Sequence, residues 1–83
     1  MSAQRYKAMA RKHWSQWLPE RVKELKETDS LEPTLLVAGT NAQRRVLELM
    51  QQGYKAHEAE EVALSEFILL KPETVDEYAS PDE

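Results

Sequence analysis

A stretch near the middle of the chain, residues 31–53, places the strongest constraint on the fold. Its apolar side chains recur at spacings of three and four, which is the repeat of one face of an α-helix. The main stripe consists of Leu31, Leu35, Ala38, Ala42, Val46 and Leu49, and a second stripe beside it consists of Leu36, Leu47 and Met50. Because a helix that is apolar over so wide an arc needs cover, we expect it to lie between two other elements.

Both ends of this helix carry sequence signals. Asp29 and Glu32 have the spacing of a capping box. Ser30 is an equally good cap, and it would place Pro33 in the first turn, where the missing amide hydrogen costs nothing. Gly53 supplies the residue that most often ends a helix in the left-handed conformation. These signals predict a helix that begins near residue 31 and ends before residue 53.

Gly39 interrupts the middle of this helix and leaves two interpretations open. The small residues Ala38, Gly39 and Ala42 could form a low surface where another helix crosses closely. Alternatively, the helix could break at Gly39 and restart with Thr40 or Asn41 as its cap. We favour the crossing, because the apolar stripe keeps its phase across the glycine.

The first part of the chain, residues 3–26, predicts another helix. Pro19 lacks an amide hydrogen and clashes with the preceding turn, so this helix should kink or break there. Trp14 and Trp17 are three residues apart and therefore share a face. We expect them to fill the core, and the competing interpretation is an aromatic anchor at an interface.

A last helix is predicted for residues 56–70, followed by Pro72, which prevents its continuation. The apolar run at residues 67–70 should be buried on several sides or meet a partner. Residues 73–83 contain five acidic side chains, no basic one and a second proline, which is the composition of a disordered tail. The expected fold is all-α: a small three-helix bundle in a single domain, residues 1–72, with a flexible acidic tail at residues 73–83.

The net charge of −4 conceals an uneven distribution. Residues 1–30 sum to +3 and residues 51–83 to −7. The two ends could simply attract each other within the fold, or they could bind a basic partner or nucleic acid. The candidate phosphate contacts are Arg5, Lys7, Arg11, Lys12, Arg21 and Lys23. A sequence pI of about 5.2 argues against nucleic acid as the partner.

Few side chains could support catalysis or hold a metal ion. The chain has no cysteine and two histidines. His57 and Glu61 lie one helical turn apart, but no further ligand completes a shell around them. His13 has no acidic neighbour in sequence that would orient it as a base. We therefore expect no enzyme, no catalytic residue, no cofactor and no metal site.

Two observations bear on the location of the protein. The absence of cysteine fits a reducing compartment. The longest apolar run, residues 67–70, is far shorter than the roughly 20 residues that span a bilayer. We expect a cytoplasmic protein that does not enter the membrane.

Three blocks of sequence carry a resemblance. They read HWSQWLPE at residues 13–20, LMQQG at residues 49–53 with EAEE at residues 58–61, and FILLKPE at residues 67–73. In these blocks the chain resembles the small helical proteins of unassigned function that bacteriophages and prophages carry. The resemblance implies a phage or mobile-element origin, expression in the cytoplasm of the host cell and a function performed by binding.

These observations predict a non-enzymatic protein–protein interaction module that docks on a partner protein or associates with itself. The candidate partner-binding residues are Trp14, Trp17, Phe67, Ile68, Glu58 and Glu61. One alternative is an inhibitor of a host defence or of a nucleic-acid-binding enzyme, acting through the acidic surface. A second alternative is a nucleic-acid-binding accessory protein that uses the basic amino-terminal helix.

Overall fold

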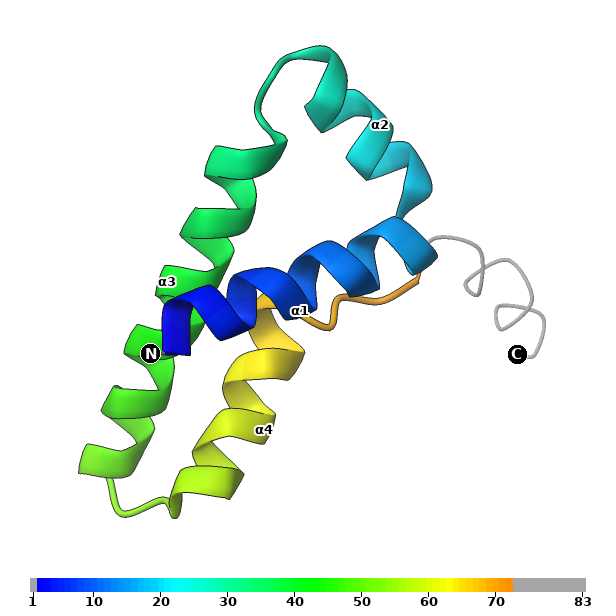
Figure 1. Cartoon of the computed structure of the whole chain (residues 1–83). Coiled ribbons are helices and arrows are strands. Elements are labelled where there is room, and N and C mark those ends of the chain that lie inside the picture. The colour runs from blue at the N-terminus through cyan, green and yellow to red at the C-terminus, as the bar shows by residue number, and fades with distance from the viewer. Residues whose placement is uncertain (1, 73–83) are drawn as a thin grey trace, which may run out of the picture.

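Helices make up the described part of the chain. The computed structural model describes residues 2–72, with the backbone alone at Ser2. These residues form α1 (Ser2–Trp17), α2 (Pro19–Glu27), α3 (Leu31–Gln51) and α4 (Ala56–Phe67), and no strand occurs among them (Figure 1). The all-α prediction is confirmed. The predicted acidic tail, residues 73–83, lies outside the described residues.

The first predicted helix is broken rather than kinked at Pro19. Leu18 has φ −129° and ψ 55°, outside the helical region, and separates α1 from α2. Pro19 occupies the first position of α2, where its missing N–H leaves no hydrogen bond unmade. The two helices consequently diverge, and α2 leads away from α1 toward the beginning of α3 (Figure 1). The described residues therefore form four helices where the sequence predicted three.

The turn between α2 and α3 differs from the predicted cap. Asp29 has φ 55° and ends α2 in the left-handed conformation. The Ser30 amide donates to Leu25 O at 2.7 Å and the Asp29 amide to Lys26 O at 3.1 Å, which is the Schellman pattern. Ser30 precedes α3, but its side chain makes no capping hydrogen bond. Asp29 thus terminates one helix and does not cap the next.

α1 and α3 cross at Gly39. α3 runs without interruption through this glycine, as the phase of the stripe predicted. A Cβ atom built on Gly39 would lie 2.6 Å from the carbonyl oxygen of Ala3 and 3.1 Å from the amide nitrogen of Lys7. The backbone of α1 therefore touches α3 at a point where only glycine fits. The crossing interpretation is confirmed.

α3 and α4 are joined by a short turn around Gly53. Gly53 has φ 106°, and the Tyr54 amide donates to Leu49 O at 3.0 Å, which completes a second Schellman motif. The backbone N–H of Lys55 donates to the Glu58 carboxylate at 3.2 Å at the start of α4. α4 ends at Phe67, three residues earlier than predicted. It runs antiparallel to the carboxy-terminal half of α3 (Figure 1).

The buried apolar side chains form a single core cluster. Its largest fully buried side chains are Trp14, Tyr6, Leu35 and Ile68. The Cα atoms span 37 × 37 × 14 Å, and the shortest dimension corresponds to about two stacked helices at the usual separation of 8–10 Å. Within residues 2–72, no helix combines the length and apolar character needed to cross a bilayer.

α3 packs against two other helices, α1 and α4, but they leave its second apolar stripe uncovered. Its first stripe is covered by α1 and α4, and Leu35, Ala38, Ala42 and Leu49 are buried there. Of the second stripe, Leu36 is 43%, Leu47 54% and Met50 43% exposed. In Figure 1 the other helices lie to one side of α3. The cover predicted for the second stripe is therefore absent in the described part of the chain.

Candidate interaction surface

Several basic residues of α1 form ion pairs that join the helices. Arg5 donates to the Glu60 carboxylate at 2.6 Å, and the Tyr6 hydroxyl donates to the same carboxylate at 2.7 Å. These two hydrogen bonds, that of Arg5 first, lower the pKa of Glu60. The arrangement ties the beginning of α1 to α4.

A second group of charges ties α1 to the beginning of α3. Arg11 donates to Glu32 through two nitrogens, at 2.5 and 2.8 Å, and the Lys7 ammonium lies 3.1 Å from the same carboxylate. The hydrogen bonds from Arg11 and then Lys7 lower the pKa of Glu32 to about 2. Farther along α3, Arg45 donates to Glu66 of α4 at 3.1 Å. Ion pairs thus connect α3 to both of its main neighbours.

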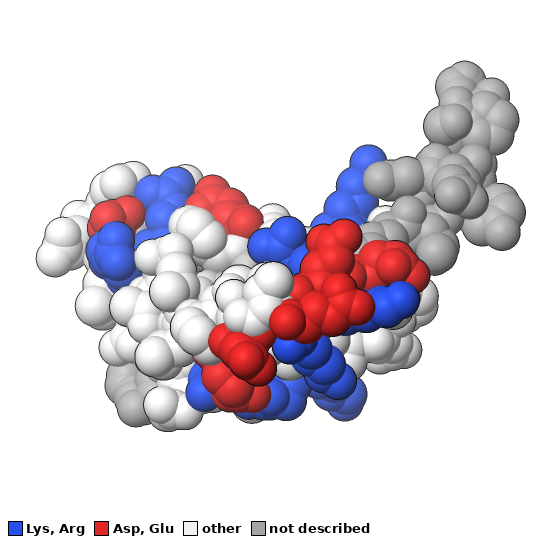
Figure 2. Space-filling model, turned by 90° about the horizontal axis from the view of Figure 1, so that it is seen from above, with Lys and Arg blue, Asp and Glu red and all other residues white. Residues whose placement is uncertain are grey.

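Several of the candidate nucleic-acid contacts take part in these ion pairs. Three of the six, Arg5, Lys7 and Arg11, are held by carboxylates of other helices. The Arg21 guanidinium lies over the Trp14 ring, 5.1 Å from its centroid. The remaining two are Lys12 and Lys23, which are exposed. Basic and acidic side chains lie beside one another on the face shown in Figure 2, and the basic ones form no continuous patch there.

The candidate partner-binding residues do not gather on one surface. Trp14 is 2% exposed and donates its indole N–H to Ile68 O at 2.8 Å. Ile68 is fully buried. Both side chains are therefore part of the core and present no area to a partner. Trp17 is 40% exposed, which shows that the expectation of two core tryptophans was wrong for this one.

The other candidates lie on or beside α4. Phe67 is half-buried, and it lines a cleft of about 230 Å³ that Trp14 also lines. Val37 of α3 lines the same cleft. Glu58 and Glu61 are exposed on α4, and Glu58 accepts the hydrogen bond that begins this helix. The structure thus brings Trp14 and Phe67 together and leaves Glu58 and Glu61 elsewhere on the surface.

The outer face of α3 is the apolar surface that sequence reasoning missed. We define it by Leu36, Leu47 and Met50, which are 43, 54 and 43% exposed. Isolated exposed apolar residues are ordinary, but several along one helix form a stripe that water solvates poorly. The sequence already contained the signal for this face, because Leu36, Leu47 and Met50 form the second apolar stripe. We had expected other elements to cover that stripe.

A cleft adjoins the carboxy-terminal end of this outer face. Leu47 and Met50 form one wall, and Tyr6 of α1 and Ala56 of α4 lie around the rest of a volume of about 220 Å³. Beyond it, Tyr54 is 43% exposed in the turn that follows α3. The apolar surface therefore continues from α3 toward the α3–α4 turn.

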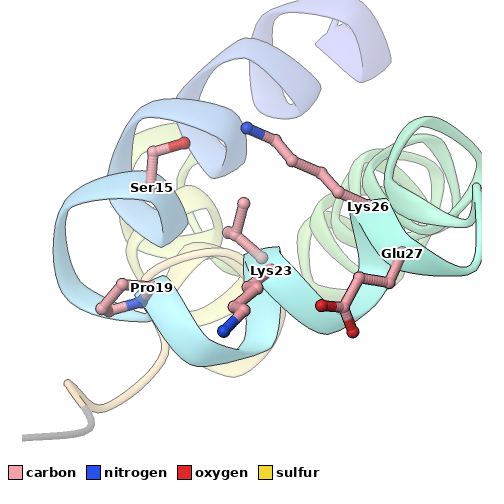
Figure 3. A pocket seen from close by; sticks show the side chains of 6 residues that line it. Ser15, Pro19, Lys23, Lys26 and Glu27 are labelled. Atoms are coloured by element: carbon pink, nitrogen blue, oxygen red, sulfur yellow. The ribbon is translucent and has the colours of Figure 1, made fainter.

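Another depression, between α1 and α2, has a volume of about 440 Å³ (Figure 3). It is lined by Ser15, Pro19, Val22, Lys23, Lys26 and Glu27. No histidine lines it, so Ser15 has no imidazole base there. Among residues 2–72, no group of three or more histidine, aspartate or glutamate side chains is placed to hold a metal ion.

Comparison with known proteins gives no match to this chain, either among protein-family models, among curated proteins or among solved structures.

Proposed function

We propose that this chain is a non-enzymatic protein–protein interaction module that binds its partner through the outer face of α3. The observation that carries the proposal is the exposure of Leu36, Leu47 and Met50 along one side of a single helix. An apolar stripe of this kind gains free energy when another surface removes it from water, at roughly 25 cal/mol per Å². Such stripes are characteristic of sites where proteins bind one another.

The charges support this proposal more than a role in binding nucleic acid. Phosphate binding requires several cations that are free to replace counterions. Arg5, Lys7 and Arg11 are instead paired with carboxylates across helix contacts. The charge separation along the sequence is thus used, at least at these positions, to hold the fold together. An origin in a phage or mobile element remains part of the proposal and rests on the sequence resemblance.

A photo-crosslinking experiment in the cells that naturally express the protein tests the interaction surface. Benzoylphenylalanine replaces Leu36 in one variant and Leu69 in the other. The two leucines have the same exposed fraction, 43%, but Leu69 lies beyond the end of α4 and lines a depression with Met9 and His13 of α1. We expect defined protein adducts from position 36 and markedly fewer from position 69, measured by gel mobility and mass spectrometry.

Equal or absent adducts at the two positions would contradict the proposal. Circular dichroism of each purified variant checks that the helices are retained. The mass of an adduct also distinguishes its source, since a second copy of the chain adds 9.6 kDa and another protein adds its own mass. Either source supports the outer face of α3 as an interaction surface.

A further inference from the structure

The exposed side of α3 contains a longer sequence repeat, which includes polar residues as well as those of the apolar stripe. The positions Pro33, Leu36, Thr40, Gln43, Leu47 and Met50 follow one another at spacings of three, four, three, four and three. Five of these six residues are exposed and Gln43 is half-buried. This alternation of three and four is the heptad pattern by which two helices pack along a shared seam. We call these six positions the seam.

The seam is symmetrical about its own centre. From the point midway between Asn41 and Ala42, the first seam residues in the two directions are polar, Thr40 and Gln43. The next are both leucines, Leu36 and Leu47, and the last are Pro33 and Met50. A stripe with this symmetry matches itself when a second copy runs in the opposite direction.

We propose that the partner of the outer face is a second copy of this chain, packed as an antiparallel α3–α3 pair about a two-fold axis. This inference rests on the proposed function and specifies its partner. A two-fold axis makes each contact occur twice, so Leu36 of one copy meets Leu47 of the other and the reverse. Thr40 faces Gln43 of the other copy, and their side chains can exchange a hydrogen bond at the centre.

The charges on α3 are compatible with this pairing. None of the six seam residues is charged, so the axis brings no like charges together within the seam. Glu32, beside one end of the seam, is already held by Lys7 and Arg11 of its own copy. Arg44 lies next to the seam, and its guanidinium donates to the Asn41 side chain at 3.2 Å. The aliphatic part of Arg44 is then available to cover apolar surface at the edge of the pair.

The arrangement of the other helices leaves room for the pair. α1 and α4 cover the side of α3 that contains Leu35, Ala38 and Leu49, which lie between seam positions and are buried. Of the seam residues, Leu36 is 43% and Leu47 54% exposed, and Leu47 and Met50 border the cleft that Tyr6 and Ala56 also line. Two copies can therefore approach through α3 while each keeps its own core.

The size of the seam predicts a weak dimer. From residue 33 to residue 50 the helix rises about 26 Å, which is fewer than three heptads. A contact of this length buries on the order of 1,000 Å² in total, at the lower end of specific protein interfaces. We therefore expect association that depends on protein concentration and not a permanent dimer.

Sedimentation equilibrium of the purified full chain, from low micromolar to near-millimolar concentration, tests the pairing. The apparent mass should rise from 9.6 kDa toward twice that value. Leu36→Glu should weaken association by about 100-fold or more, because each dimer contains the buried charge twice. Leu69→Glu changes a leucine of the same exposure outside the seam and should leave association unchanged.

Disulfide trapping tests the direction of the two helices. The chain has no cysteine, so Thr40→Cys and Gln43→Cys each contain a single thiol. When the two variants are mixed and oxidised, the antiparallel pair forms the mixed disulfide between position 40 and position 43. A parallel pair would instead form disulfides between identical positions, and mass spectrometry separates these products.

The results that would overturn the antiparallel pair differ from those that would overturn the proposed function. A chain that remains monomeric at all concentrations, or dimers that form only identical-position disulfides, would overturn the antiparallel pair. If the monomeric chain still forms adducts with a different protein from position 36, the interaction surface stands and only the identity of its partner changes. Loss of association in both Leu36→Glu and Leu69→Glu would also exclude the seam.

Discussion

Leu35 and Leu36 are neighbours in the sequence and experience opposite environments. Leu35 is fully buried in the core cluster, and Leu36 is 43% exposed on the outer face. The covered side of α3 is made of small residues at the crossing with α1 and is tied to its neighbours by ion pairs. The outer side carries larger apolar residues without cover. The two sides of one helix thus separate the residues that stabilise the fold from the surface that we propose for binding.

The largest loss of stability is expected when a buried side chain on the covered side of α3 is shortened. Leu35→Ala should lower the free energy of unfolding by about 3 kcal/mol, because it leaves a cavity in the core. Leu36→Ala should lower it by less than about 1 kcal/mol in the monomer, because the side chain is already partly solvated. Urea denaturation at low protein concentration measures both values. Similar losses in the two variants would contradict the division between covered and outer sides.

A smaller loss is expected at the helix crossing. Gly39→Ala should destabilise the fold by about 1–2 kcal/mol, because the new Cβ meets backbone atoms of Ala3 and Lys7 that can move only with α1. The gain of about 1 kcal/mol in helix propensity is not enough to offset this. Thr40→Ala, at the next and exposed position, is the control and should change stability by less than about 0.5 kcal/mol. A stabilised Gly39→Ala variant in thermal unfolding would show that the helices do not cross so closely.

At two helix ends, the expected changes in stability come from backbone conformation and not from side-chain packing. Gly53 has φ 106° and nothing within 4 Å of a built Cβ, so Gly53→Ala should cost about 1 kcal/mol through backbone strain alone. Asp29 also lies in the left-handed region, with φ 55°, and Asp29→Gly should stabilise the fold by up to about 0.5 kcal/mol. Paired urea titrations measure the two changes. Effects of the same sign would be inconsistent with these backbone conformations.

The smallest effect is expected from the ion pairs of Glu32, and it depends on pH. The pKa of Glu32 in the folded chain, about 2, lies below its ordinary value of 4.5. The carboxylate therefore stabilises the fold above pH 4.5, and this contribution is lost as the pH falls toward 2. Both partners are exposed, so added salt should reduce the effect.

Carboxyl NMR measures the titration of Glu32 directly. Arg11→Gln removes the first hydrogen-bond donor and should raise the pKa of Glu32 toward 4.5. The acid-induced loss of stability should then become smaller than in the unaltered chain. A Glu32 pKa that is the same with and without Arg11 would contradict the ion pair between α1 and α3.

Much of the local structure could be predicted from particular residues. Pro19 indicated a kink or a break, and Gly53 the end of a helix, because each acts through its own backbone and the adjacent turn. Gly39 could be assigned to a crossing because the stripe kept its phase on both sides. The predicted cap at Asp29 was wrong, since the same residue type also tolerates the left-handed conformation that ends a helix.

The candidate site was harder to predict than the helices. Trp14 and Trp17 share one helix face by spacing, yet Trp14 is 2% and Trp17 is 40% exposed. Trp14 lies in the core because α3 and the segment after α4 cover it, and its indole N–H reaches Ile68 O across 54 residues of sequence. The position of that carbonyl oxygen cannot be derived from the spacing within α1.

The sequence by itself determined the helical class, the helix ends near residues 31 and 53, and the interruption at Pro19. These features depend on hydrogen bonds and torsion angles within about four residues. Only the tertiary structure decided which side of α3 is covered and which faces open space. That choice depends on distant contacts, such as the approach of Ala3 to Gly39, that local periodicity does not contain.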